Sequence, residues 1–331
     1  MRKPTDLFRT TEQNTQQPVI IKNQKYMKLN RDLSHYSHLV SKLFTWPCAR
    51  EEWDNYRLTE KQIDFFKVNG YLSDVKLLEE WQVDLLNKEL EEVMDPQHPE
   101  HDLLYEFHSN ESTEPGKVLF HSLGHWRMTP GFHDVLWNPA FVMAAYQLLG
   151  NKTVRFWHDQ LFCKPARHGG VVAWHQDYSY WTRSKPMQHL TAWIGLDDAT
   201  QENGCLHYVP GSHRWGFLDK PVLTGEMEGL KAFLNEAQTE ELKHAVPIEM
   251  KKGYGTFHHP LLVHGSFENR SDRPRRAFVI NVFADGTYSD SDQPLLDGVP
   301  GVGKGQKLEG RFFPLLFDNH QDGESLGSHK P

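Results

Sequence analysis

The chain has 331 residues, of which 38% are hydrophobic and 12% aromatic, so it can bury a large core within one or two domains. Its net charge of −8 argues against a general nucleic-acid-binding protein, which would need a basic surface. Three cysteines, Cys48, Cys163 and Cys205, form neither a disulfide framework nor a zinc-binding spacing, and no apolar run approaches the roughly 18 residues of a membrane span.

The two ends of the chain indicate no targeting address. The amino terminus lacks the apolar stretch of a secretory signal, and the carboxyl terminus lacks a peroxisomal tripeptide. We therefore expect a cytoplasmic protein, for which the sequence indicates no protein partner. Residues 1–57 are polar and predict a partly ordered amino-terminal extension, followed by a main domain over residues 58–331.

The first half of the main domain predicts helices. Thr59 and Gln62 form a capping-box pattern, which is typical of a helix start, and a glycine follows where that helix should end. Asn138-Pro139 opens another helix, because proline is favoured at the first helical position. Between them, an apolar stripe has helical spacing and is expected to pack into the core: Leu78, Trp81, Leu85 and Val93, with Leu86 and Leu90 beside it. We expect helices over residues 59–70, 73–94 and 138–150.

From Thr153 onward the hydrophobic pattern changes to a period of two, which is typical of strands. Asn203-Gly204 is a strong turn signal between two of these expected strands. A helix-like insertion over 222–244 interrupts them and would border the opening to a substrate. Several short strands with polar turns predict a barrel or sandwich, so the fold class is mainly β with flanking helices. After residues 153–163, strands are expected at 171–177, 189–197, 204–209, 246–250, 255–257, 261–265 and 276–284.

The pair His175 and Asp177 is the strongest candidate for metal binding. In a strand, residues two apart point to one face, so this imidazole and this carboxylate are expected side by side. A distant histidine, His264, would complete a two-histidine, one-carboxylate face, which is typical of non-haem Fe(II) oxygenases. His258 and His259 compete with His264 for this place. A supporting or packing role is favoured for both, because the Gly-Ser after His264 lets the backbone approach a ligand.

An arginine near the third histidine offers a second binding group. Arg275 follows His264 by a turn and begins an apolar strand, and its planar guanidinium suits a carboxylate. Alternation allows only one of Arg275 and Arg276 to face inward. Arg270 and Arg273 are expected to be solvated residues of the turn.

These motifs resemble the phytanoyl-CoA dioxygenase family of Fe(II)- and 2-oxoglutarate-dependent oxygenases. The resemblance covers roughly residues 58–285 and is carried by Trp174-His175-Gln176-Asp177, by Glu202-Asn203-Gly204-Cys205-Leu206 with Val209-Pro210-Gly211-Ser212-His213, and by His259-Pro260-Leu261-Leu262-Val263-His264-Gly265-Ser266 with Arg275. It implies a double-stranded β-helix, a cupin-like jelly-roll barrel. It also implies roles for particular residues: iron ligands His175, Asp177 and His264, the 2-oxoglutarate anchor Arg275, and cosubstrate contacts Trp193, Ser266 and Gln160.

The resemblance implies a hydroxylase that uses Fe(II), 2-oxoglutarate and O2, acts on a small molecule and releases succinate and CO2. No catalytic residue beyond the metal ligands is implied. Where the family has a lysine that helps to hold 2-oxoglutarate, this chain has His121 or Ser122, so a phytanoyl-CoA substrate is not assumed.

The sequence leaves alternatives open. Tyr178, Tyr180 and Trp181 would either cover a substrate pocket or pack at the rim of the barrel. Two other functions also remain, a metal-dependent isomerase or hydrolase on a similar jelly roll, and a non-catalytic metal-binding scaffold.

Overall fold

The computed structural model describes residues 29–95, 97–111, 119–167, 170–223 and 226–318. The chain divides into two compact units, Met1–Asn30 and Arg31–Pro331, and every helix and strand of the described residues lies in the second. Most of the first unit therefore lies outside the described residues. A domain boundary at residue 58 stays a prediction. Residues 31–57 contact the rest of their unit, since the backbone of Val40 and Ser41 donates to the buried Asp134 carboxylate at 2.8 Å in each case.

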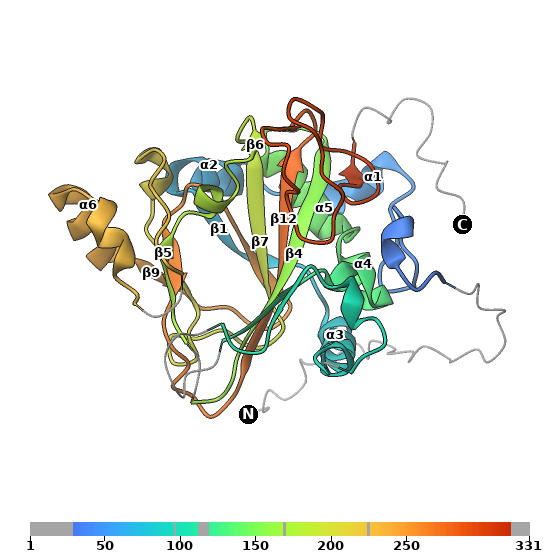
Figure 1. Cartoon of the computed structure of the whole chain (residues 1–331), viewed down its shortest axis with the longest axis horizontal. Helices are drawn as coiled ribbons and strands as arrows, with labels where there is room; N and C mark the ends of the chain where they lie inside the picture. Colours follow the sequence, from blue (N-terminus) through green and yellow to red (C-terminus); the bar gives the residue numbers. More distant parts are fainter. Residues whose placement is uncertain (1–28, 96, 112–118, 168–169, 224–225, 319–331) are drawn as a thin grey trace, which may run out of the picture. The chain divides into compact units, whose positions relative to one another are not determined.

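Two antiparallel sheets form the framework of the second unit (Figure 1). The larger sheet has the order β1-β10-β7-β12-β4-β3-β2, with β14 paired to β4, and the smaller has the order β5-β11-β8-β9. β13 and β6 form a separate pair. The strands are β1 Tyr71–Lys76, β2 Glu106–His108, β3 Phe120–Leu123, β4 Val154–Lys164, β5 Val172–His175, β6 Ser184–Lys185, β7 His189–Gly195, β8 Leu206–Tyr208, β9 Val246–Ile248, β10 Tyr254–His258, β11 His264–Ser266, β12 Arg275–Ala284, β13 Tyr288–Ser289 and β14 Leu315–Phe317.

Helices cover the face of the larger sheet that points away from the smaller sheet, as α4 and α5 show in Figure 1. The α-helices are α1 Arg50–Trp53, α2 Glu60–Asn69, α3 Glu80–Val93, α4 Pro130–Val135, α5 Pro139–Leu148 and α6 Glu236–Glu241. The short 3-10 helices are η1 Leu33–His35, η2 Asp54–Tyr56, η3 His101–Leu103, η4 His125–Arg127, η5 Asp177–Tyr180, η6 Ser212–Arg214, η7 Gly229–Phe233 and η8 Leu242–His244.

Alternation along the central strand β12 explains why the larger sheet has two different faces. Phe278 and Ile280 belong to the core beneath the helices, whereas Ala277 and Val279 belong to the core between the sheets. Burying a side chain as large as that of valine, isoleucine or phenylalanine stabilises a fold by about 1.5–3 kcal/mol relative to leaving it exposed. The face toward the smaller sheet also carries Arg275, so this side of β12 brings a charged group into the space between the sheets.

Two of the three expected helix starts are confirmed. Thr59 caps α2 by accepting from the Gln62 amide, and Asn138 caps α5 by accepting from the Ala140 amide. Gly70 ends α2 with φ of 81°, and a Cβ atom there would lie 2.5 Å from Nδ1 of His213. Only glycine fits this helix end without strain.

The prediction of a helix from Ser73 is wrong at its start. Tyr71–Lys76 forms β1, which pairs with β10, and the helix α3 begins only at Glu80. Pairing with a strand nearly two hundred residues later in the chain, as in Tyr71 with His258, overrides the local helical pattern. Leu86, Leu90 and Val93 of the expected apolar stripe are fully buried. Trp81 and Leu85 are exposed, so the prediction that the whole stripe packs inward is confirmed only in part.

Two expected strands around the candidate metal ligands are also wrong at one end. β5 stops at His175, and Asp177 already begins the 3-10 turn η5. β11 begins only at His264, because the residues before it form a turn in which the Leu262 amide donates to the His259 carbonyl. The insertion over 222–244 is helical only in part, through η7, α6 and η8.

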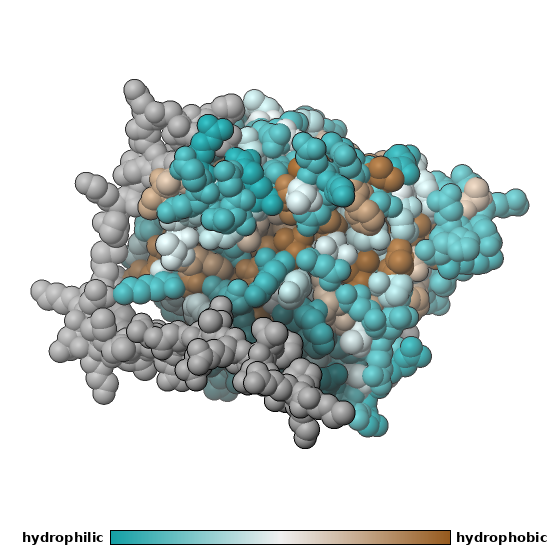
Figure 2. Space-filling view, turned by 180° about the vertical axis from the view of Figure 1, so that it is seen from behind, coloured by the Kyte–Doolittle hydropathy of each residue, from teal (hydrophilic) through white to brown (hydrophobic). Residues whose placement is uncertain are grey.

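Most large apolar side chains of the described residues are buried, but some remain at the surface. Seen from behind, hydrophobic surface gathers in the middle of the face and is bordered by hydrophilic residues (Figure 2). None of the described helices is long and apolar enough to cross a membrane. All three cysteines lie within the described residues and are free. The cytoplasmic location stays a prediction.

Candidate metal and cosubstrate site

Three side chains that are distant in sequence converge between the sheets. His175 ends β5 and His264 begins β11, and the two residues face each other directly in the β5–β11 pair. Asp177 follows at the start of η5, and its Oδ1 lies 3.4 Å from Nε2 of His175 and 3.5 Å from Nε2 of His264. One donor atom from each residue lies within 4.8 Å of the others, which is compatible with a single metal ion.

The tautomer of both histidines follows from their hydrogen bonds. Nδ1 of His175 lies 2.7 Å from the Ala173 carbonyl oxygen, and Nδ1 of His264 lies 2.9 Å from that of Leu262. A carbonyl only accepts, so each Nδ1 carries the hydrogen and each Nε2 keeps a lone pair. Burial, helped by His175 and His258, holds the pKa of His264 well below its usual value. A neutral imidazole that presents Nε2 is the form that binds a metal.

Asp177 is held as a carboxylate with one oxygen left for a metal. Burial alone would raise its pKa, but the hydrogen bond from His258 helps to outweigh burial, and the pKa of Asp177 lies well below the usual value. Its Oδ2 accepts from Thr191 Oγ1 at 2.6 Å and from His258 Nε2 at 3.0 Å. These bonds fix the carboxylate and leave Oδ1 directed at the two histidines.

The supporting contacts explain what His258 and His259 do. His258 lies between Asp177 and the hydroxyl of Tyr208, which is 2.9 Å from its Nδ1. His259 accepts the amide of Leu261 at 3.1 Å and so has a local role in the turn. Thr191 and Tyr208 were not singled out in the sequence. Thr191 shares its face of β7 with Trp193, and that spacing of two was a usable signal.

Arg275 is a buried cation without a counter-charge among the described residues. The residue is 2% exposed, and its Nε has no hydrogen-bond partner. Its guanidinium carbon lies 5.4 Å from the centre of the Trp193 ring. Burial lowers the pKa of Arg275 to about 10, so the group stays charged at neutral pH. The nearby Asp197 is instead paired with Arg276, at 2.8 Å.

The expectation that only one of Arg275 and Arg276 faces inward is therefore confirmed. Arg275 faces inward and Arg276 faces outward, while Arg270 and Arg273 are exposed. An unpaired arginine that is buried this deeply is expensive for a fold unless an anion binds to it.

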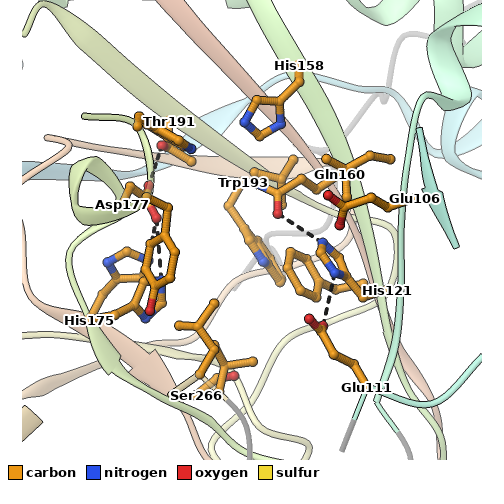
Figure 3. Close-up of a pocket in the computed structure, with 18 of the residues that line it drawn as sticks. Glu106, Glu111, His121, His158, Gln160, His175, Asp177, Thr191, Trp193 and Ser266 are labelled. Atoms are coloured by element: carbon orange, nitrogen blue, oxygen red, sulfur yellow. Dashed lines mark hydrogen bonds and ion pairs between the residues drawn. The ribbon is translucent and has the colours of Figure 1, made fainter. Parts of the chain in front are cut away.

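The space between these groups is a cavity of about 430 Å³. Figure 3 shows Asp177 and His175 on one side, with Glu111 and His121 on the other. Trp193, Ser266 and Arg275 also line the cavity, and so does Gln160. The donor set and the unpaired cation thus open into the same space.

The structure decides which of His121 and Ser122 faces this cavity. His121 lines it, with Nε2 at 3.0 Å from Gln160 Oε1 and Nδ1 at 3.0 Å from Glu111 Oε2. Ser122 points away and bonds His125 Nε2 at 2.6 Å. Burial would raise the pKa of Glu111, but the His121 contact outweighs it and keeps this carboxyl ionised.

The three aromatic residues after Asp177 separate into two kinds. Tyr180 and Trp181 line the cavity. Tyr178 is absent from the lining, and its hydroxyl donates to the Ser184 carbonyl at 2.7 Å. Tyr178 and Tyr180 lie within the 3-10 turn η5 and Trp181 directly follows it, so their side chains do not alternate as they would in a strand. The position of Tyr178 does not support a role in binding substrate.

Comparison with known proteins gives a consistent picture. The family model described as phytanoyl-CoA dioxygenase (PhyH) matches residues 66–277. A phytanoyl-CoA dioxygenase of Arabidopsis thaliana is 28% identical over 255 residues, which are 68% of this chain and 88% of that protein. A Caenorhabditis briggsae homologue of phytanoyl-CoA dioxygenase domain-containing protein 1 is 30% identical over 181 residues, or 52% of this chain and 62% of that protein.

Solved structures with this architecture are also similar. The epimerase SnoN in complex with Fe3+, alpha ketoglutarate and nogalamycin RO has a TM-score of 0.64 and 21% identity, covering 78% of this chain and 98% of that one. EctD from S. alaskensis with 2-oxoglutarate and 5-hydroxyectoine has a TM-score of 0.56 and 24% identity, covering 70% of this chain and 78% of that one. These likenesses confirm the expected double-stranded β-helix fold.

Proposed function

The chain belongs to the phytanoyl-CoA dioxygenase family of Fe(II)- and 2-oxoglutarate-dependent oxygenases, and on this basis we propose that it hydroxylates a small organic substrate. Succinate and CO2 would be the products formed from 2-oxoglutarate. Bound together, Fe(II), 2-oxoglutarate and O2 would supply the oxidising chemistry that this hydroxylation needs. The protein's own residues bind, orient and shield these groups.

The proposed iron ligands are Nε2 of His175, Nε2 of His264 and Oδ1 of Asp177. The Nε2 lone pairs of the two histidines and the fixed carboxylate of Asp177 support this assignment, because these donor atoms already lie close enough together to bind one cation. Such a three-ligand face leaves positions open for a keto acid and for O2. A carboxylate at Asp177 also argues against halogenation, since that reaction needs this position for a halide.

The observation that carries the proposal is the charge of Arg275 in the same cavity, for which the part of the chain that the structure describes offers no counter-charge. A dicarboxylate whose keto-acid end binds the metal would bring its far carboxylate to this guanidinium, which offers a planar pair of donors. Trp193, Ser266 and Gln160 are proposed as further cosubstrate contacts. A metal-dependent isomerase or hydrolase would leave Arg275 without a partner, so the arginine disfavours that alternative.

The remaining cavity supports a substrate of modest size. Tyr180 and Trp181 offer apolar surface, and Glu111 and His121 offer polar contacts on the opposite side. We propose Tyr180 and Trp181 as substrate-binding residues. Nothing in this lining favours a phytanoyl-CoA thioester over another small molecule, and the substrate itself is left to experiment.

The test begins with anaerobic titration of the Fe(II)-loaded protein with 2-oxoglutarate, followed by the visible absorption band of the metal–keto acid complex. We expect the band in the wild type and its loss in Asp177→Ala. Screening of candidate compounds for increased succinate release then addresses the substrate. Absence of the band, together with no succinate from any compound, would favour a non-catalytic metal-binding scaffold. Full activity of an Arg275→Ala variant would favour the isomerase or hydrolase.

A further inference from the structure

A lysine that the sequence analysis did not single out lies behind the cosubstrate end of the cavity. Lys164 is the last residue of β4, and it stands directly opposite Arg275 in the β4–β12 pair. Its exposed fraction is 0%. Ser266, the last residue of β11, packs against it, with Oγ at 2.7 Å from the lysine Nζ. Three strands thus bring Lys164, Ser266 and Arg275 together.

The acceptors around Nζ determine how the Ser266 hydroxyl is oriented. Besides Ser266 Oγ, Nζ contacts the carbonyl oxygens of Ser266 at 3.2 Å and of Phe267 at 2.5 Å. An ammonium has three hydrogens and cannot accept, and the two carbonyls cannot donate. When Lys164 is charged, Ser266 Oγ must therefore accept the third hydrogen, and its own hydrogen must point elsewhere.

That hydrogen is available to a ligand in the cavity. Ser266 lines the cavity with Arg275, and Lys164 does not line it. Among the described residues, the Ser266 side chain has no hydrogen-bond partner other than Lys164. A carboxylate placed between the guanidinium of Arg275 and this hydroxyl would supply the missing acceptor.

We propose that Lys164 is a positioning residue that turns the Ser266 hydroxyl into a donor for the far carboxylate of 2-oxoglutarate. The inference rests on the proposed function and extends it to a residue that would not touch the cosubstrate. Ser266 and Arg275 would then bind the same carboxylate from two sides, and Lys164 would fix the direction of the Ser266 contact.

The charge of Lys164 explains why the arrangement favours an anion. Burial and the neighbouring Arg275 lower its pKa well below the usual value, and Cys205 and Glu268 oppose them. A neutral amine would donate to the two carbonyls and accept from Ser266, so the hydroxyl would then present only lone pairs to the cavity. An anion beside Arg275 offsets the repulsion between the two cations and favours the donating arrangement.

The test compares two 2-oxo acids that differ at the far end. Binding of 2-oxoglutarate and of 2-oxobutyrate, which lacks the far carboxylate, is measured by calorimetry on the anaerobic Fe(II)-loaded full chain. We expect Lys164→Met to weaken 2-oxoglutarate about 10- to 100-fold, as for one hydrogen bond to a charged group, and to leave 2-oxobutyrate unchanged. Ser266→Ala should weaken the binding of 2-oxoglutarate in the same selective way. The double variant with both substitutions should bind 2-oxoglutarate no more weakly than the weaker-binding of the two single variants.

Five results would overturn the proposal. Equal losses for both acids would show a general structural role, and losses that add in the double variant would show that Lys164 and Ser266 act independently. If Lys164→Met fails to fold, Ser266→Ala decides the matter, because unchanged 2-oxoglutarate binding in it excludes the donor role. A wild type that binds neither acid refutes the proposed function as well. A wild type that binds 2-oxoglutarate while Lys164→Met binds it equally well refutes only the role of Lys164.

Discussion

Replacement of Arg275 by methionine separates a cation that binds a ligand from one that supports the fold. The side chain is buried and has no counter-charge among the described residues, so its loss removes an unfavourable charge and keeps much of the packing volume. Replacing buried charges with apolar residues is often neutral or stabilising by about 1–4 kcal/mol. Without 2-oxoglutarate, we expect the free energy of unfolding to stay the same or to increase.

The same variant should lose its affinity for 2-oxoglutarate. Hydrogen bonds to a charged group contribute about 1.5–3 kcal/mol each, so losing two from the guanidinium costs roughly 3–6 kcal/mol. This corresponds to binding that is about 100- to 10,000-fold weaker. At a hundredfold excess over its Kd, a ligand stabilises the native state by about 2.7 kcal/mol, and this increment should disappear in Arg275→Met.

The assay is thermal or denaturant unfolding of the Fe(II)-loaded protein under anaerobic conditions, with and without 2-oxoglutarate. Arg276→Met is the matched control, because it breaks a partly exposed ion pair with Asp197 on the other face of the strand. It should reduce stability by about 1–2 kcal/mol and leave the response to 2-oxoglutarate intact. The reasoning is refuted if Arg275→Met instead destabilises the unliganded protein by more than about 3 kcal/mol while its affinity stays near the wild-type value.

Further predictions concern the metal centre and a buried carboxyl. Asp177→Ala should abolish Fe(II) binding and succinate formation, and normal turnover by this variant would defeat the assignment. Thr191→Val removes the donor to Asp177 Oδ2 and should weaken Fe(II) binding about tenfold without unfolding the protein, and a metal titration showing equal affinity would contradict this. Burial raises the pKa of Asp159 to about 6, although the amides of Trp126 and Gly124 donate to it. Because the pKa of Asp159 is higher in the folded than in the unfolded protein, protonation of this carboxyl favours the folded state at pH values below the unfolded pKa, which lies near 4. This contribution to stability is lost as the pH rises toward 6. Asp159→Asn cannot titrate, so its stability relative to the wild type should increase by about 1–3 kcal/mol between pH 4 and 7. Denaturant unfolding at both pH values measures this difference, and a constant difference would rule out a titrating Asp159.

Local patterns in the sequence were sufficient where neighbouring residues control the structure. The cap at Thr59, the cap at Asn138 and the stop at Gly70 depend on hydrogen bonds or φ values within one turn of helix. That only one of Arg275 and Arg276 faces inward follows from alternation within one strand, and the family resemblance indicated Arg275. The grouping of His175, Asp177 and His264 was expected from residue chemistry and family resemblance together.

The remainder needed contacts between distant segments. β1 is a strand because β10 pairs with it, and the turn after His175 places Asp177 by a route that strand alternation did not predict. His258, Thr191 and Lys164 acquire their roles from partners on other strands.

The sequence by itself therefore determined the fold class, and together with the family resemblance it predicted the metal donors and the arginine anchor, because these depend on residue type and short-range periodicity. Only the tertiary structure decided which oxygen of Asp177 is left for a metal, that Arg275 has no counter-charge among the described residues, and that a buried lysine contacts Ser266. Each of these is a property of hydrogen bonds and desolvation between segments that are distant in the chain, and no local pattern encodes them.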